Sequence, residues 1–344
     1  MRTSQRRRSG RGLLVVVAAI GVVALAGYVG YVAVEASDKL VAAYVSRDCT
    51  TPADPAYGWA YEAINYDAAD DPRLIAENPD PANCQRRGVD AGEGVVAADG
   101  TRLAGWYIPA ASPDPARPTV LLVHGHDANK SEMLPIAAAL HDRYDLVLLD
   151  LRASGQSTGT RQTLGVEEQL DVAAILTWLK TAKGEDKVAA LGVSGGAAAV
   201  LAEARTDDRI GAFIADSMHA RWSTLSEQMM DNATVFGVDQ PAYPGTWAAR
   251  LGVAIRTGLD LSSVDPIDSL ASLEDRPLLL LHGTADQDDV SEESVEVNLA
   301  EARRLGVDVA LHYCEGAGHA AVIETCAADY GAWVSAFLDR AFAN

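Results

Sequence analysis

Short segments that are almost entirely apolar alternate with helix-forming segments along most of this chain. A strand that is apolar at nearly every position is buried on both faces, as in a parallel sheet covered by helices. The sequence therefore predicts an α/β domain with a mostly parallel sheet and helices on both faces. The predicted strands are residues 119–123, 146–149, 187–191, 210–215, 277–281 and 307–312, after a hairpin of 94–96 and 103–108, and the predicted helices are 130–143, 166–180 and 327–341.

The N-terminus differs from the rest of the chain. Five arginines lie within the first 11 residues, and an uncharged run follows from Leu13 to Val34. As a helix this run would be about 33 Å long, enough to cross a hydrocarbon core of about 30 Å. Because arginines favour the cytoplasmic side, we expect residues 1–12 to be a cytoplasmic tail and 13–34 a single transmembrane helix. The remainder would then be extracytoplasmic; the alternative is a cleaved signal peptide and a secreted protein.

Three further segments are predicted after the transmembrane helix. Residues 35–92 are rich in Asp, Pro, Ala and Asn, and we interpret them as a juxtamembrane extension. Residues 93–344 carry the alternating pattern and form the predicted globular domain. Within it, residues from about 217 to 273 show no clear strand, and we interpret them as a small cap inserted after a strand. Apolar residues of such a cap could line a pocket for an acyl or alkyl group.

The net charge and the cysteines limit which partners, metal sites and disulfides are expected. A net charge of −20 argues against a nucleic-acid partner, because nucleic-acid binding depends on a basic surface. No Cys or His spacing suggests a metal site, and we expect neither a metal nor a cofactor. Four cysteines suit an oxidising compartment and allow three pairings. We favour Cys49–Cys84 and Cys314–Cys326; reduced, buried thiols are the alternative.

A G-x-S-x-G motif at residues 192–196 lies between the predicted strand 187–191 and an Ala-rich helical segment. A serine at a sharp strand-to-helix turn is held in strained geometry with its hydroxyl exposed, and the next N–H, that of Gly195, points toward a developing oxyanion. We therefore interpret Ser194 as a candidate nucleophile. A second match surrounds Ser157, but its nearest strand ends about seven residues earlier, and we interpret Ser157 as a polar loop residue.

A serine nucleophile requires a base and a carboxylate that orients the base. His319 is the candidate base because it lies in a Gly-rich turn directly after a predicted strand. Asp286 is the candidate acid because it follows the apolar strand 277–281. Asp288 and Asp289 are close rivals, and Asp216, which ends another strand, is a further alternative. The backbone N–H of His126, after the strand 119–123, is the candidate second donor of the oxyanion hole.

Further motifs occur at the matching places along the chain. They are Gly105-Trp106-Tyr107-Ile108-Pro109, His124-Gly125, Asp150-Leu151-Arg152-Ala153-Ser154-Gly155-Gln156-Ser157 and Asp265-Pro266-Ile267. With these motifs and the order serine, aspartate, histidine, residues 93–341 resemble the α/β-hydrolases, and in particular serine hydrolases of that fold with an N-terminal membrane anchor. Ala153 stands where that family usually has glycine in its D-x-R-G-x-G-x-S loop.

The resemblance implies an α/β-hydrolase fold with Ser194 as nucleophile, Asp286 as acid and His319 as base. The expected function is a membrane-anchored serine hydrolase that cleaves carboxylic esters, with a small-molecule acyl ester as substrate. The same triad would serve a thioesterase or a serine peptidase. A non-catalytic binding module is an alternative from another class, since one fold can host many functions.

Overall fold

The structure is a computed structural model, and its described residues are 3–44, 50–64, 94–231, 234–235, 238–239, 242–287 and 290–343. The chain divides into two compact units. The larger unit comprises Ala42–Met229 and Leu261–Asn344, and the smaller comprises Met1–Val41 and Met230–Asp260.

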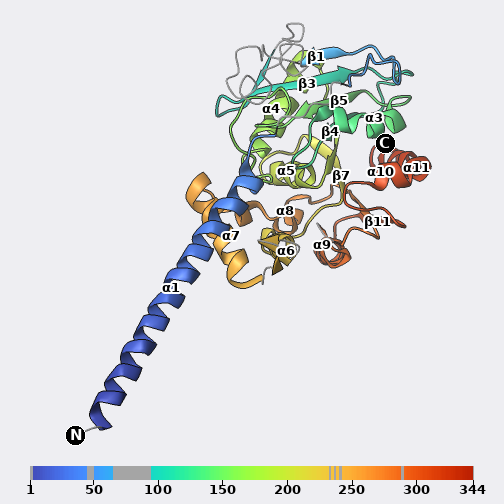
Figure 1. Cartoon of the computed structure of the whole chain (residues 1–344). Coiled ribbons are helices and arrows are strands. Elements are labelled where there is room, and N and C mark those ends of the chain that lie inside the picture. The colour runs from blue at the N-terminus through green and yellow to red at the C-terminus, as the bar shows by residue number, and fades with distance from the viewer. Residues whose placement is uncertain are drawn as a thin grey trace. The chain divides into compact units, whose positions relative to one another are not determined.

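Among the described residues, nine strands form the central sheet of the larger unit (Figure 1). The order across the sheet is β1-β3-β5-β4-β6-β7-β10-β11, and β2 pairs with β3. The neighbours from β5 to β11 are parallel, whereas β1, β2 and β5 pair with β3 in antiparallel fashion. The strands are β1 (Glu62–Ile64), β2 (Val95–Val96), β3 (Arg102–Ile108), β4 (Thr119–Val123), β5 (Leu146–Asp150), β6 (Val188–Val193), β7 (Ile210–Asp216), β10 (Leu278–Gly283) and β11 (Val309–Cys314).

Both faces of the central strands are buried, because their successive side chains enter different cores. In β4, Leu121 and Val123 join one hydrophobic cluster and Val120 and Leu122 join the other. Residues of α4, α5 and α9 complete the first cluster, and residues of α3 and α11 complete the second. The helices of this unit are α3 (Leu134–Leu140), α4 (Gln169–Trp178), α5 (Gly195–Glu203), α8 (Pro266–Ser269), α9 (Glu292–Leu305), α10 (Val322–Thr325) and α11 (Ala327–Ala341).

The predicted mostly parallel sheet covered by helices is thereby confirmed, and the predicted strands lie within two residues of the observed ones. The hairpin is also present, with β2 paired to β3 across a turn in which Gly100 has φ +91°. Two helices begin differently from the prediction. The first starts as a 3₁₀ helix, Lys130–Met133, capped by the Asn129 side chain. The second starts only at Gln169, because the Glu168 carboxylate accepts N–H groups of the preceding turn.

The smaller unit contains the N-terminal helix α1 (Thr3–Val41) and helix α7 (Ala242–Thr257). Within α1, Leu14–Glu35 has a mean hydropathy of 2.3 and is long and apolar enough to cross a membrane, as is also true of signal sequences. Two short strands, β8 (Thr234–Val235) and β9 (Val238–Asp239), form a pair in the segment for which we expected no clear strand. Helix α6 (Trp222–Asp231) spans the boundary of the two units, and 3₁₀ turns follow at Leu261–Val264 and Leu270–Ser272.

Candidate functional site

The turn between β6 and α5 holds Ser194 in a strained conformation. Its φ of +51° and ψ of −117° lie outside the regions that a non-glycine residue ordinarily adopts. The turn leaves no room for a side chain at either glycine. A Cβ on Gly192 would lie 2.4 Å from the Ala197 nitrogen, and a Cβ on Gly196 would lie 2.4 Å from the His124 carbonyl oxygen. These contacts explain why the motif requires glycine on both sides of the serine.

Ser194, His319 and Asp286 form a continuous chain of hydrogen bonds. The Ser194 Oγ lies 2.9 Å from His319 Nε2, and His319 Nδ1 lies 2.8 Å from Asp286 Oδ2. The Asp286 side chain is buried, and its other oxygen accepts the Val290 N–H at 3.0 Å. With Nδ1 donating to the carboxylate, Nε2 is free to accept the serine proton. The structure thus brings together three residues that are 33 and 125 positions apart.

The alternative candidates for the acid were Asp288, Asp289 and Asp216. Asp288 and Asp289 lie outside the described residues. The Asp216 carboxylate is buried and accepts hydrogen bonds from Ser217 Oγ at 2.9 Å and Tyr330 Oη at 3.1 Å. Burial raises the pKa of Asp216 to about 7, and the two hydrogen bonds partly oppose that rise. Asp286, rather than Asp216, is the acid bonded to His319.

Ser217 connects the two turns of the site, and sequence analysis did not single it out. The Ser194 N–H donates to the Asp216 carbonyl at 2.8 Å, and the Ala320 N–H donates to Ser217 Oγ at 3.1 Å. The backbone positions directly beside His319 and at Ser194 are therefore both anchored on residues 216–217. The available signal was the position of Ser217, directly after an acid at a strand end.

Replacing Ser217 by alanine is expected to lower the free energy of unfolding by about 1–3 kcal/mol, because the partly buried Ala320 N–H and the buried Asp216 carboxylate each lose a partner. For hydrolysis at this candidate site, kcat should fall more than KM changes, because the His319 turn is loosened. Urea denaturation and steady-state kinetics measure the two effects. Ser226→Ala is the matched control, since the buried Ser226 hydroxyl donates to the Ser223 carbonyl within its own helix. Equal effects of the two substitutions would contradict the role of Ser217.

The predicted oxyanion donors lie next to each other. A Cβ on Gly195 would lie 3.4 Å from the backbone nitrogen of His126, which places this nitrogen against the first residue of α5. A helix N-terminus and a neighbouring backbone N–H form a suitable environment for developing negative charge. A small pocket opens at this point. Its lining residues are Gly125, His126, Leu151, Gln162, Leu164, Glu168 and Gly195.

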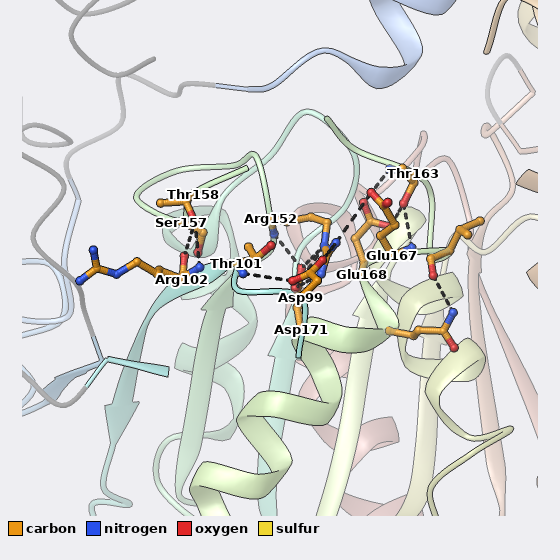
Figure 2. Close-up of polar contacts among 12 residues, drawn as sticks. Asp99, Thr101, Arg102, Arg152, Ser157, Thr158, Thr163, Glu167, Glu168 and Asp171 are labelled. Carbon is orange, nitrogen blue, oxygen red and sulfur yellow. Dashed lines mark hydrogen bonds and ion pairs between the residues drawn. The ribbon is translucent and has the colours of Figure 1, made fainter. Parts of the chain in front are cut away.

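Ser157, in the second G-x-S-x-G match, is a loop residue as expected, but it is fully buried. Its Oγ donates to the Asp150 carbonyl at 2.6 Å and accepts the Ala104 N–H at 2.9 Å. Figure 2 shows Ser157 beside Arg102 and Thr158. A hydroxyl engaged in this way holds the loop to β3 and is not placed for attack on a substrate.

The loop that contains Ser157 is held by a buried arginine (Figure 2). The Arg152 guanidinium donates to Asp171 at 2.7 Å and to Asp99 at 2.7 Å. Ala153, which departs from the family's glycine, has φ +57°, a conformation that glycine adopts without steric cost. Alanine therefore adopts this conformation at the cost of local backbone strain.

A disulfide joins Cys314 and Cys326, as favoured from the sequence, with a Cα–Cα distance of 6.1 Å. The favoured Cys49–Cys84 pair lies outside the described residues. Cys314 ends β11 and Cys326 precedes α11, so the closed loop contains His319. Such a loop limits the freedom of the candidate base.

Replacing both Cys314 and Cys326 by alanine is expected to lower the free energy of unfolding by about 2–4 kcal/mol, because the unfolded chain gains conformational freedom. Activity should decline at temperatures below the unfolding transition, because the His319 turn is then less restrained. Thermal denaturation and activity assays on the same samples test this. Unchanged activity up to the unfolding temperature would show that the disulfide stabilises the domain without positioning His319.

Comparison with known proteins agrees with the fold. A family model described as "alpha/beta hydrolase fold" matches residues 118–236. The esterase Pf2001 of Pyrococcus furiosus superposes with a TM-score of 0.61 over 86% of this chain and 98% of its own, at 21% identity. An acylaminoacyl peptidase of Pyrococcus horikoshii gives a TM-score of 0.54 over 71% of this chain and 40% of its own, at 17% identity. The chain has the expected α/β-hydrolase fold, and the family model of that fold matches it over residues 118–236.

Curated relatives are similar over part of the chain. The proteins named YfhR from Escherichia coli O157:H7 and from strain K12, both described as uncharacterized, are 31% and 30% identical over 196 residues. The aligned region covers 56% of this chain and 61% of each relative. The chain therefore matches about three fifths of the length of these relatives.

Proposed function

We propose that this α/β-hydrolase is a membrane-anchored serine hydrolase that cleaves carboxylic esters. The observation that carries the proposal is the hydrogen-bonded chain from Ser194 through His319 to Asp286, at 2.9 and 2.8 Å. A serine hydroxyl is a weak nucleophile at neutral pH unless a base takes its proton, and an oriented histidine provides that base. The strained turn at Ser194 supports the same interpretation, because strain of this kind is concentrated at active sites.

The geometry supports a two-step acyl transfer. His319 Nε2 takes the Ser194 proton as Oγ attacks the ester carbonyl carbon, and the carbonyl oxygen becomes an oxyanion. The backbone N–H groups of His126 and Gly195 stabilise this oxyanion. The C–O bond then breaks, and the imidazolium returns its proton to the leaving alcohol. Water attacks the acyl-enzyme with His319 again as the base, which releases the acid and restores Ser194.

Ester cleavage is the form of this chemistry that we propose. Pf2001 is named as an esterase, and its structural likeness to this protein extends over most of both chains. Because the Pyrococcus horikoshii structure is that of an acylaminoacyl peptidase, amide cleavage is also tested. Thioesters undergo the same acyl transfer and are tested with it. Each substrate class differs in the leaving group that His319 must protonate, so a panel of leaving groups separates them.

The membrane part of the proposal rests on α1. Residues 13–34 would span the bilayer, with residues 1–12 in the cytoplasm and the domain of residues 93–344 outside, connected by residues 35–92. Residues from about 217 to 273 would form the cap. The disulfide between Cys314 and Cys326 is compatible with that side of the membrane, where disulfides persist. Secretion after cleavage of the N-terminal segment is the alternative outcome.

A fluorophosphonate probe tests the catalytic proposal on the full chain in membranes. Only an activated serine reacts, so peptide mapping should find the label on Ser194. A panel of short- and long-chain acyl esters, acyl thioesters and aminoacyl amides then identifies the preferred bond. A folded protein that takes up no label and cleaves none of these substrates would favour a non-catalytic binding module and overturn the proposal.

A further inference from the structure

Helix α7 in the smaller unit exposes an apolar stripe along one side. Trp247, Leu251 and Ile255 are 53%, 36% and 73% exposed, and their spacing of four residues places them on the same face of the helix. The opposite side of α7 is buried at Ala249 and Val253. Single exposed apolar residues are ordinary, but a continuous stripe with a tryptophan indicates a surface that is covered in use.

The same helix packs against the end of the candidate membrane span. Val32 of α1 contacts α7 in a small hydrophobic cluster. A Cβ on Gly252 would lie 2.0 Å from the carbonyl oxygen of Ala33, so the two backbones are in close contact there. One turn further along, Arg256 forms an ion pair with Asp38. Figure 1 shows α7, in orange, crossing the upper part of α1, in blue.

These contacts show which part of α1 each part of α7 lies beside. Ala33 lies within the apolar segment Leu14–Glu35, whereas Asp38 lies just beyond it. Gly252 is therefore level with the last turn of the span, and Arg256 is level with the first polar turn after it. The stripe residues Trp247 and Leu251 precede Gly252 in α7, toward the middle of the span.

We propose that the stripe formed by Trp247, Leu251 and Ile255 is buried in lipid, at the boundary of acyl chains and headgroups where α1 leaves the bilayer. The occupant is lipid because the neighbouring surface of α1 is itself apolar and exposed, so one bilayer would cover both helices. Tryptophan is favoured at this boundary, and amphipathic helices lie at this depth. This inference rests on the membrane anchoring in the proposed function, but not on its chemistry.

Lipid-borne quenchers test the depth of the stripe in the full chain. An environment-sensitive fluorescent amino acid is placed at Leu251 in protein reconstituted into vesicles of phosphatidylcholine and phosphatidylglycerol. The same residue is placed at Ile20, an exposed position in the middle of the span, and at Val297, an exposed apolar position on α9. Doxyl-labelled phosphatidylcholine reports contact with lipid, and iodide reports contact with water.

The probe at position 251 is expected to behave like that at position 20, with blue-shifted emission and most of its intensity lost to the doxyl lipid. Quenching by iodide in place of lipid would overturn the inference, and so would protection from both quenchers, which would indicate a protein partner. If position 20 also escapes the lipid quencher, the anchor and the inference both fail. Repeating the measurement with Ser194→Ala keeps this result separate from the catalytic proposal, because the readout involves no turnover.

Discussion

Ser194→Ala is expected to abolish ester hydrolysis, lowering kcat by about a millionfold, because Ser194 Oγ is the hydroxyl that bonds to His319 and would accept the acyl group. The fold should be retained, since the N–H of residue 194 can still donate to the Asp216 carbonyl and alanine adds no bulk. Hydrolysis rates of the preferred ester, measured alongside circular dichroism of the same preparation, test both parts. The substitution should also remove labelling by a fluorophosphonate.

Ser157→Ala is the matched control, because it removes a hydroxyl from the other G-x-S-x-G sequence. We expect most of the activity per folded molecule to remain. Stability should nevertheless decrease, by about 1–3 kcal/mol, because the buried Ala104 N–H and the loop lose the Ser157 bonds. If the Ser157 variant folds but is inactive while the Ser194 variant turns over, the assignment of the nucleophile is wrong.

Asp286→Asn should lower kcat by about 10⁴-fold while the local geometry stays nearly the same. The amide can present its nitrogen to His319 Nδ1, which favours the tautomer with the proton on Nε2, and that tautomer cannot accept the serine proton. Steady-state kinetics with the preferred ester measure the loss. Because the lost interaction serves the transition state, kcat should change far more than KM.

The other carboxylates serve as controls for that substitution. Asp288→Asn and Asp289→Asn should have mild effects. Asp216→Asn should have a smaller effect than Asp286→Asn, because Asp216 bonds to Ser217 and Tyr330 and acts on His319 only from a distance. A loss at Asp288 or Asp216 as large as that expected at Asp286 would move the role of the acid to that residue.

Much of the fold and of the site could be predicted because both depend on local patterns. The strand 119–123 is apolar at almost every position, and only a sheet buried on both faces accommodates such strands. Ser194, Asp286 and His319 could be nominated together because each follows a strand. The carboxyl ends of parallel strands meet at one edge of the sheet, so residues at these ends are neighbours.

The tertiary structure was needed wherever two residues in similar local sequence settings were alternatives for the same role. Asp216 ends β7 and Asp286 follows β10, and the hydrogen bond to His319 is what distinguishes them. The hydrogen bond from the Ala320 N–H to Ser217 Oγ joins segments that are 103 residues apart, and no periodicity encodes such a pair. The start of α4 at Gln169 likewise depends on the Glu168 carboxylate, which accepts the N–H groups of Thr163 and Gly165.

By itself the sequence determined the alternation of strands and helices, the apolar N-terminal span and the serine at a sharp turn. Each of these follows from backbone geometry and burial within a few neighbouring residues. The structure alone decided that His319 bonds to Asp286, that Ser157 is engaged in its loop, and that α7 packs on α1 through Gly252. Those results depend on how distant segments pack, because side-chain contacts form only after the sheet and helices have assembled.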